Sequence, residues 1–422
     1  MNRRQFLGTA SAAAALPASA NPVDKPALLG GTPMRLTGTR QWPVFDQTEE
    51  QAMLGVLRSG KWYRGSGQMV RKFEEQYAAL TGAKHCLAVA NGTSALLASI
   101  SALGIDAGDE VILPPYTFVA TLNVILEKHA LPIFCDTDRA SFQMDAKKLE
   151  AKITDRTKLI MPVHMGGASV DLDSILATGK KHNVPVLEDA CQAHLGEWRN
   201  RKVGTYGVAG CFSFQASKNL NSGEGGAVLF NDEAFMEATR AFHSNQANSQ
   251  SLNLRITEFQ AALLMAQMTR LETQSKTREQ NAAYLTKMLN EVQGIAPAKL
   301  YPGCTRNAWH LYMFRYDKQH FANMPREKFL KALAAEGVPA SGGYTPLNKQ
   351  PLLKRTFATR GFRRVFSEAE LKRWEERNHC PENDKLCEEA VWLTQPTLLG
   401  PRTDMEVIAG AIRKIQHHAA SL

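Results

Sequence analysis

The chain has 422 residues, of which 44% are hydrophobic and 22% charged, so it can bury a substantial core and is long enough for two or three domains. Its formal net charge of +9 is spread along the sequence, with Lys and Arg interleaved among Asp and Glu, which argues against a nucleic-acid-binding protein. After residue 20 no segment holds the roughly 18 uninterrupted apolar residues of a membrane helix, so we expect no membrane span.

The first twenty residues differ from all that follow. Arg3 and Arg4 precede a short apolar run that ends in small residues at positions 18–20, which suit a cleavage site. Residues 1–20 are therefore predicted to be a twin-arginine signal that exports the folded protein to the periplasm; without export the protein would be cytoplasmic. The alternative is a frayed amphipathic start of the chain.

Cysteines are scattered through the sequence, in an odd number and without the close pairs of a zinc site. They are Cys86, Cys135, Cys191, Cys211, Cys304, Cys380 and Cys387. Several lie inside apolar runs, where a thiol is usually a small buried hydrophobe. We expect neither a metal site nor a disulfide framework.

Between residues 84 and 231, short apolar runs alternate with longer, polar, helix-like stretches. The strand-like runs are HCLAVAN, EVILPP, PIFCDTD, KLIMPVHM, VPVLEDA, VAGCFSF and GAVLFND. Near-continuous apolar runs separated by helical segments are typical of a mostly parallel sheet covered on both faces. We therefore predict one large α/β domain over residues 21–290.

A helix is predicted around Ile256–Leu271, with apolar residues spaced at three and four and with Thr257 and Gln260 placed to form a capping box. Over residues 291–422, short strands and helices mix, which predicts a smaller α+β domain. A basic segment lies within residues 352–388. We interpret it as solvated surface; the alternative is a flap over the site that supplies Arg or Lys to a substrate.

In VANGTSALLAS a strand is expected to end at Asn91, followed by a tight turn at Gly92 and a helix that starts with Thr93 and Ser94. The free N–H groups at the N-terminus of such a helix predict a phosphate-binding site. The segment lacks the GK[ST] of a Walker loop and the three glycines of a dinucleotide fingerprint. The alternative is a simple strand-to-helix turn with a threonine cap.

Glu188 and Asp189 end another apolar run, which places them at the carboxyl edge of the sheet, where open α/β sheets bind ligands. An unpaired buried carboxylate is costly, so Asp189 needs a partner. A protonated pyridine nitrogen is one such partner, and a role as a helix N-cap is the alternative.

Lys218 follows the strand-like CFSF and precedes the glycine-rich SGEGG, which lets the backbone pass close to a ligand. A lysine in a partly desolvated site loses its proton more readily and becomes a nucleophile suited to Schiff-base chemistry. A phosphate seat, a strand-end aspartate and a recessed lysine, in that order on an α/β sheet, are the parts of a pyridoxal 5'-phosphate site.

These motifs resemble the DegT/StrS-type aminotransferases from about Trp42 to the C-terminus. The matching segments are LRSGKW, NGTSALLASI, DEVILPPYTFVAT, PVHMGG, EDACQAH, FSFQASKNLNSGEGGAV and NLRITEFQAAL. The resemblance implies the type I, aspartate-aminotransferase-like fold, with a seven-stranded, mostly parallel sheet and a smaller C-terminal α+β domain. Gln192 and the FSFQ before the lysine are more similar to the branch with glutamine:scyllo-inosose aminotransferase and aminohydroxybenzoate synthase than to the nucleotide-sugar branch.

By position, the resemblance implies that Lys218 forms the internal aldimine with pyridoxal phosphate and that Asp189 keeps the ring nitrogen protonated. It further implies that Phe118 stacks on the face of the cofactor and that Gln192 reaches its phenolic oxygen. Without the resemblance, Phe118 would be interpreted as a core aromatic residue.

The resemblance also implies a phosphate site made by Gly92, the amides of Thr93 and Ser94, and the Ser213 hydroxyl. Asn253, otherwise a turn residue, is implied to reach the phosphate of the neighbouring subunit. We therefore expect a homodimer with shared active sites.

The expected activity is a ping-pong transamination that moves an amino group from glutamine or glutamate to a keto-sugar or keto-cyclitol, with Lys218 as general base and then acid. One alternative is a dehydratase or aromatising synthase on the same fold, but the related dehydratases carry histidine in place of the lysine. A second alternative is a non-catalytic, sensory protein that binds the cofactor. Asn348 departs from the histidine of many members, which leaves the acceptor pocket open.

Overall fold

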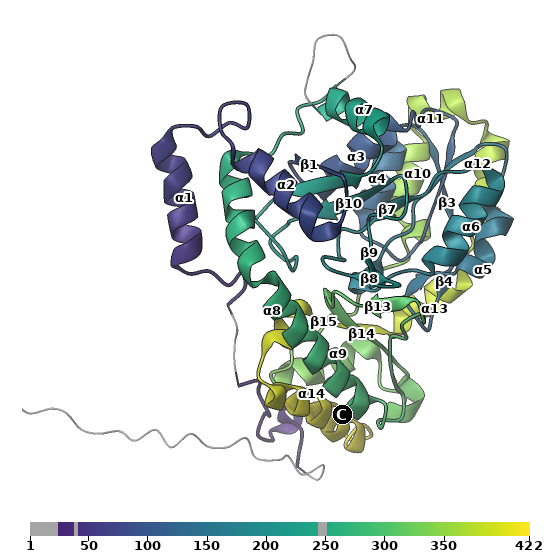
Figure 1. Ribbon diagram of the computed structural model, residues 1–422. Helices are drawn as coiled ribbons and strands as arrows, with labels where there is room; N and C mark the ends of the chain where they lie inside the picture. The colour runs from purple at the N-terminus through teal and green to yellow at the C-terminus, as the bar shows by residue number, and fades with distance from the viewer. Residues whose placement is uncertain (1–23, 38–40, 244–250) are drawn as a thin grey trace, which may run out of the picture.

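The computed structural model describes residues 24–37, 41–243 and 251–422 (Figure 1). The predicted export signal, residues 1–20, lies outside the described residues. Within those ranges no helix combines the length and the apolar composition needed to cross a membrane. The seven cysteines are free thiols.

The centre of the larger unit is a sheet in which seven strands of the described chain lie in the order β1-β11-β10-β7-β6-β2-β3. In that order, their bounds are His85–Val89, Gly226–Phe230, Ala209–Ser213, Leu187–Asp189, Thr157–Ile160, Glu110–Leu113 and Leu131–Phe134. Parallel bridges between Ile160 and Val186 and between Val163 and Asp189 join β6 to β7. β11 runs antiparallel to both of its neighbours, and the other pairings are parallel. The predicted seven-stranded, mostly parallel sheet is confirmed.

The strand ends bring the predicted site residues to one edge of the sheet. Ser213, the last residue of β10, pairs with Gly226, and Gly226 also pairs with Val89 of β1. Asp189 ends β7 beside Cys211 of β10. Because parallel strands end at the same edge, the carboxyl ends of β1, β7 and β10 meet there.

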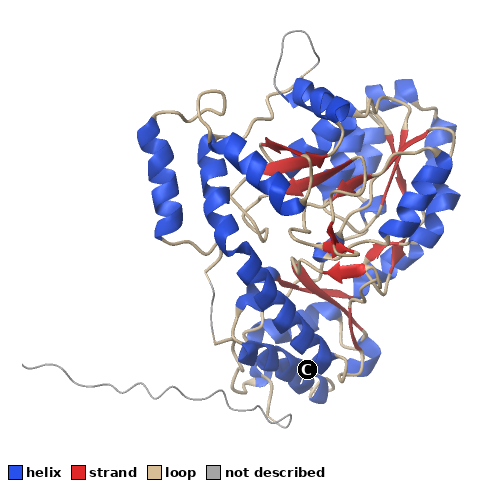
Figure 2. Ribbon diagram, viewed as in Figure 1, coloured by secondary structure: helices blue, strands red, loops and turns tan. Residues whose placement is uncertain are grey.

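Helices cover the sheet and bury its apolar side chains in one large core (Figure 2). They are α2 (Met69–Thr81), α3 (Gly92–Ala102), α4 (Val119–Glu127), α5 (Ala146–Leu149), α6 (Leu172–His182) and α7 (Glu233–His243). Helix α1 (Gln47–Ser59) stands apart from this core and packs against α8 (Figure 1). Short helical turns are η2 (Glu150–Lys152) and η3 (Met165–Gly167).

Helix α8 (Glu258–Leu289) runs unbroken from the sheet to the smaller C-terminal unit (Figure 1). Its capping box joins Thr257 and Gln260, as predicted, although the helix extends far beyond Leu271. The smaller unit has its own core. Its elements are β12 (Ile295–Pro297), β14 (Leu311–Tyr316), β15 (Ala390–Thr394), η4 (Lys318–Phe321), α9 (Arg326–Ala335), η6 (Gln395–Leu399) and α14 (Arg402–His417).

The described chain also contains further short strands and helical turns. They are β4 (Thr137–Asp138), β5 (Gln143–Met144), β8 (Glu197–Trp198), β9 (Arg201–Lys202), β13 (Cys304–Arg306), η1 (Ala27–Leu29) and η5 (Leu347–Lys349).

The division at residue 290 remains a proposal, and two segments cross it. Residues 27–37 bond to the smaller unit: Ala27 N–H donates to Glu336 at 2.8 Å, and Thr37 donates to Asp404. In the other direction, the segment that forms η5 and the following helices returns to the large core. These helices are α10 (Pro351–Phe357), α11 (Arg360–Val365) and α12 (Glu368–Arg377). α13 (Pro381–Glu389) follows, and its Leu386 and Cys387 belong to a separate, smaller cluster.

Helix α12 lies against β3, the outer strand of the sheet. The Trp374 Nε1–H donates to the carbonyl of Pro132 at 2.6 Å, and the Phe134 N–H donates to the Asn378 side chain at 2.5 Å. Asn348 also bonds in this region, through its Nδ2 to the Asn378 carbonyl at 2.9 Å. The apolar side chains of the predicted basic segment are therefore core-facing, and its charged side chains face outward.

Candidate active site

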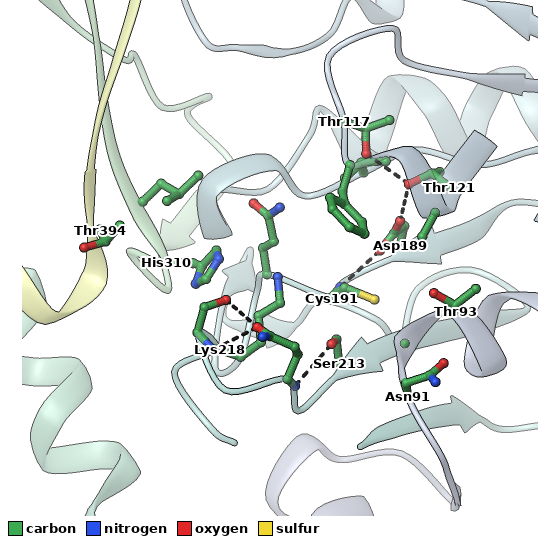
Figure 3. A pocket seen from close by; sticks show the side chains of 18 of the residues that line it. Asn91, Thr93, Thr117, Thr121, Asp189, Cys191, Ser213, Lys218, His310 and Thr394 are labelled. Atoms are coloured by element: carbon green, nitrogen blue, oxygen red, sulfur yellow. Dashed lines mark hydrogen bonds between the residues drawn. The ribbon is translucent and has the colours of Figure 1, made fainter. Parts of the chain in front are cut away.

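A cavity of about 970 Å³ opens at the carboxyl edge of the sheet. One wall comes from the sheet unit and includes Gly92, Asp189 and Lys218, and the other comes from the smaller unit and includes His310 and Thr394. Figure 3 shows Asn91 and Thr93 on one side of the cavity, His310 and Thr394 on the other, and Lys218 between them. Residues 352–388 contribute no side chain to the described lining, which does not support their interpretation as a flap.

Asp189 is 4% exposed at the end of β7 and keeps a fixed orientation. Its Oδ2 accepts a hydrogen bond from the Thr121 hydroxyl at 2.8 Å, and its Oδ1 accepts from the Cys191 N–H at 3.2 Å (Figure 3). The Thr117 hydroxyl lies 3.0 Å from the Thr121 hydroxyl and helps to fix its position. A carboxylate oxygen accepts more than one hydrogen bond, so Asp189 can still bind a protonated nitrogen in the cavity.

Lys218 lies on the turn that leaves β10 and points into the cavity (Figure 3). Its N–H donates to the Gln215 carbonyl at 2.8 Å, which closes the turn. Burial lowers the pKa of Lys218, and the nearby Cys191 and Asp189 oppose that shift. The amine therefore loses its proton at a lower pH than a solvated lysine does, which favours nucleophilic attack.

The N-terminus of α3, where the phosphate site is predicted, has a different cap from the one in the alternative interpretation. Asn91 is the N-cap, and its side chain accepts from the Ser94 N–H at 2.8 Å. The Ser94 amide is therefore already bonded, and Ser94 does not line the cavity. At this terminus, the first-turn amides of Gly92 and Thr93 remain for an anion, and the threonine cap of the alternative interpretation is wrong.

Gly92 brings this helix end against Ser213. A Cβ at position 92 would lie 2.8 Å from the Ser213 Cβ and 3.0 Å from the Cys191 Sγ, so only glycine fits without a shift. The Ser213 hydroxyl accepts from the Gln215 N–H at 3.3 Å, which leaves its own hydrogen to donate. Helix amides and a serine hydroxyl thus converge on one cradle.

Two further predicted residues line the cavity. Phe118 precedes α4 and is 56% exposed, so its ring is available to a planar ligand. Gln192 is buried and held on both sides: its Oε1 accepts from the Gly166 N–H at 2.8 Å, and its Nε2 donates to the Tyr344 hydroxyl at 3.3 Å. The amide nitrogen keeps a second hydrogen for a ligand. Burial raises the pKa of Tyr344 to about 12.

Asn253 lies apart from this cavity. It is exposed and its side chain accepts from the Arg255 N–H at 3.5 Å. Its predicted contact is with a neighbouring subunit and remains a prediction.

Several lining residues were not predicted from the sequence. They are Trp42, Thr121, His310, Tyr344, Trp392 and Thr394. Thr121 lies within DEVILPPYTFVAT, one of the segments that resemble the family. This position was the only sequence signal that Thr121 belongs to the site. The others reach the cavity from loops and from the smaller unit.

The donor set fits pyridoxal phosphate. The cradle of Gly92, Thr93 and Ser213 suits a phosphate, the buried carboxylate of Asp189 suits a protonated pyridine nitrogen, and Lys218 suits an aldehyde. Among the described residues no group of three or more His, Cys, Asp or Glu is placed to hold a metal ion.

Residues 43–394 match the profile of the DegT/DnrJ/EryC1/StrS aminotransferase family. Among similar proteins, the L-glutamine:2-deoxy-scyllo-inosose aminotransferase of Streptoalloteichus tenebrarius is 35% identical over 427 residues, covering 94% of this chain and 98% of that protein. The 3-amino-5-hydroxybenzoate synthase of Amycolatopsis mediterranei is 31% identical over 392 residues, covering 88% and 97%.

Among solved structures, 3-amino-5-hydroxybenzoic acid synthase superposes with a TM-score of 0.80 at 29% identity, covering 90% of this chain and 99% of that one. An aminotransferase from Psychrobacter cryohalolentis superposes with a TM-score of 0.78 at 28% identity, covering 88% and 97%. The predicted fold, with its mixed α/β architecture, is confirmed.

Proposed function

Because this chain belongs to the DegT/DnrJ/EryC1/StrS family of pyridoxal-phosphate-dependent aminotransferases, we propose that it moves the amino group of L-glutamine to a keto-cyclitol. The aminotransferase activity and the cofactor follow from the family. The choice of donor and acceptor rests on relatives named as glutamine-dependent aminotransferases of scyllo-inosose derivatives.

The observation that carries the proposal is the convergence of Lys218, Asp189 and the Gly92 turn on one cavity. When bound, pyridoxal phosphate supplies an electron sink for the negative charge that develops on the donor's α-carbon. We propose that Asp189 holds the proton on the ring nitrogen and that the Thr121 hydroxyl keeps Asp189 in place. We further propose that Gly92, Thr93 and Ser213 hold the phosphate.

Lys218 has two tasks in this proposal. Its Nζ would hold the cofactor, and the free amine would act as the base that takes the proton from the donor's α-carbon and then as the acid that returns it. The burial that lowers the pKa of Lys218 keeps a larger fraction of the amine unprotonated near neutral pH. Phe118 would cover one ring face, and Gln192 would donate to the ring oxygen.

We also propose a homodimer with shared active sites. Five large apolar side chains on α1 and its flanking loops are each between 42% and 56% exposed: Phe45, Leu54, Leu57, Trp62 and Tyr63. Exposed apolar residues gathered on one side of a chain are typical of a subunit interface. Asn253 would then reach the phosphate held by the other subunit.

Export through the predicted signal is a separate proposal. It rests on the paired Arg3 and Arg4 and the apolar run after them. Expression of the full chain with Arg3 and Arg4 both replaced by Lys, followed by cell fractionation, checks it. Loss of the protein from the periplasmic fraction in the variant supports export. The same distribution between fractions for the wild type and the variant contradicts it.

The function is tested with the purified holoenzyme, L-glutamine labelled with ¹⁵N at the α-amino group, and 2-deoxy-scyllo-inosose. Mass spectrometry should find the label in an aminated cyclitol. The Lys218→Ala variant should transfer no label, and borohydride reduction should fix the cofactor to the wild-type chain at Lys218 and not to the variant. Unlabelled cyclitol with the active holoenzyme would contradict the proposed reaction.

A further inference from the structure

His310 is an imidazole on the cavity wall with no part in the roles proposed above. It lies just before β14, is 6% exposed, and lines the cavity on the side away from the phosphate cradle. Figure 3 shows it on the same side of the cavity as Thr394. Lys218 lies between it and the pair Asn91 and Thr93.

The hydrogen bonds around Asn219 fix the tautomer of His310. Asn219 follows Lys218 directly, and its Nδ2 donates to the Ala308 carbonyl at 2.6 Å, so its Oδ1 faces the imidazole. That Oδ1 lies 3.3 Å from the His310 Nδ1. An amide oxygen only accepts, so Nδ1 carries the ring proton and Nε2 carries the lone pair.

The lone pair on Nε2 is available to a ligand. No described residue forms a hydrogen bond with Nε2, and this atom is not among the described side-chain atoms that are buried without a partner. Burial lowers the pKa of His310 well below its usual value, and the positive charges of Lys218 and Arg278 act in the same direction. The ring therefore stays neutral and is too weak a base to keep a proton.

Charged side chains are few in the cavity that His310 lines; within the described lining they are Asp189, Lys218 and Glu224. The cavity lining also includes the uncharged side chains of Trp42, Leu311, Ser341, Tyr344 and Trp392. In the whole described lining, Lys218 is the one Lys or Arg. A neutral acceptor favours an uncharged N–H or O–H group over a carboxylate, whose oxygens would face its lone pair.

We propose that Nε2 of His310 is a fixed hydrogen-bond acceptor that selects substrates carrying an uncharged N–H or O–H group. This inference rests on the proposed function. In a ping-pong reaction, donor and acceptor occupy the same cavity in turn. The side-chain amide of glutamine and a ring hydroxyl of a cyclitol ketone are both uncharged hydrogen-bond donors, so one acceptor can serve both.

The experiment compares matched substrates in each half-reaction of the holoenzyme. For the donor, the bleaching of the cofactor absorbance is followed with L-glutamine and with L-glutamate, which has nearly the same shape but no side-chain N–H. For the acceptor, 2-deoxy-scyllo-inosose is compared with cyclohexanone, which has no hydroxyl. His310→Phe keeps a planar ring and removes the acceptor, and His310→Gln keeps a carbonyl acceptor.

In His310→Phe, kcat/KM for glutamine or for the hydroxylated ketone should fall by about 10-fold to 100-fold, while glutamate and cyclohexanone are unaffected. His310→Gln should recover part of the loss. A loss with glutamine alone assigns the contact to the donor, and a loss with the hydroxylated ketone alone assigns it to the acceptor. The inference is overturned if kcat/KM falls equally for glutamine and glutamate and for the two ketones. It is also overturned if kcat/KM falls for none of the four substrates.

A second readout does not depend on turnover. In holoenzyme labelled with ¹⁵N-histidine, the His310 signals, assigned by their absence in His310→Gln, should show a protonated Nδ1 and an unprotonated Nε2. The Nε2 signal should shift when glutamine is added but not when glutamate is added, or when the hydroxylated ketone is added but not cyclohexanone. A proton on Nε2 overturns the inference. Failure of the wild type to transfer any amino group would instead refute the proposed function, and the NMR result would still decide the role of His310.

Discussion

The His194 Nε2 lies 2.9 Å from the main-chain oxygen of Ser213, and on the other side of the ring Nδ1 lies 3.0 Å from the Tyr77 hydroxyl. Burial lowers the pKa of His194 to about 3, so the ring is neutral. Because a carbonyl only accepts, Nε2 carries the proton and Tyr77 donates to Nδ1. The ring also stacks on Phe214, so the end of β10 is held in one orientation.

This connection predicts that Tyr77 supports the phosphate cradle through Ser213. Tyr77→Phe should weaken binding of pyridoxal phosphate by about threefold to tenfold, because His194 loses the donor that fixes its ring. Binding of pyridoxal, which has no phosphate, should not change. Spectroscopic titration of the apoenzyme with both compounds measures the difference.

Tyr316→Phe is the matched control, since it removes a hydroxyl that donates to the Met324 carbonyl in the smaller unit. Weaker binding of both compounds to Tyr77→Phe would point to a general packing defect and contradict the predicted role.

The second prediction concerns the carboxylate at the end of β7. Asp189→Asn should lower kcat by about 100-fold or more, because an amide cannot stabilise a protonated ring nitrogen as a buried charge does. Thr121→Val should lower it by about tenfold, since Asp189 loses one orienting hydrogen bond. Steady-state kinetics on cofactor-saturated enzyme gives both values. Thr178→Val on exposed α6 is the control, and a Thr121→Val enzyme as active as that control would rule out the orienting role.

The third prediction tests the shared active site. Lys218→Ala and Asn253→Ala should each be inactive or strongly impaired alone. After the two variants are mixed under conditions that exchange subunits, each hybrid dimer contains one site with both residues intact. About a quarter of the wild-type activity should return. No recovery, despite hybrid dimers detected by native mass spectrometry, would place Asn253 outside the partner's site.

The fourth prediction concerns stability at the junction of the N-terminal segment with the smaller unit. Glu336 accepts from the Lys414 ammonium at 3.1 Å, and both side chains are almost fully buried. Its two oxygens also accept from the N–H groups of Ala27 and Met34. Glu336→Gln should therefore lower the free energy of unfolding by about 3–5 kcal/mol, because Lys414 is left as an uncompensated buried charge.

Differential scanning calorimetry measures this loss as a lower Tm. Replacing Lys414 by Met in the same variant should restore part of the stability, since the unpaired charge is removed. Glu150→Gln, which breaks an exposed contact with Lys181, should leave the Tm unchanged. A double variant less stable than Glu336→Gln would contradict this explanation.

The sheet could be predicted because each of its strands lies within a mostly apolar segment, and the start of α8 could be predicted because Thr257 and Gln260 form a local capping box. For α3, the threonine cap of the alternative interpretation is wrong; Asn91 and Thr93 are both suitable capping residues and lie two positions apart. The residue types alone do not show which of the two is the N-cap, because that depends on the direction of the chain after β1.

His310 and Tyr344 could not be placed from the sequence. They lie 92 and 126 residues after Lys218, and the packing of the smaller unit brings them to the cavity. Likewise, the sequence shows that the helices after η5 are charged on one face. It does not show that Trp374 and Phe357 belong to the large core, because that depends on which strand lies at the edge of the sheet.

The contacts of α12 with β3 also bear on solubility. An outer strand normally presents free main-chain groups that can recruit a strand from another molecule and start aggregation. Here Trp374 satisfies the carbonyl of Pro132, Asn378 satisfies the amide of Phe134, and proline itself has no N–H to offer. Helix α12, which packs against β3, therefore also prevents this strand from pairing with a strand of another molecule.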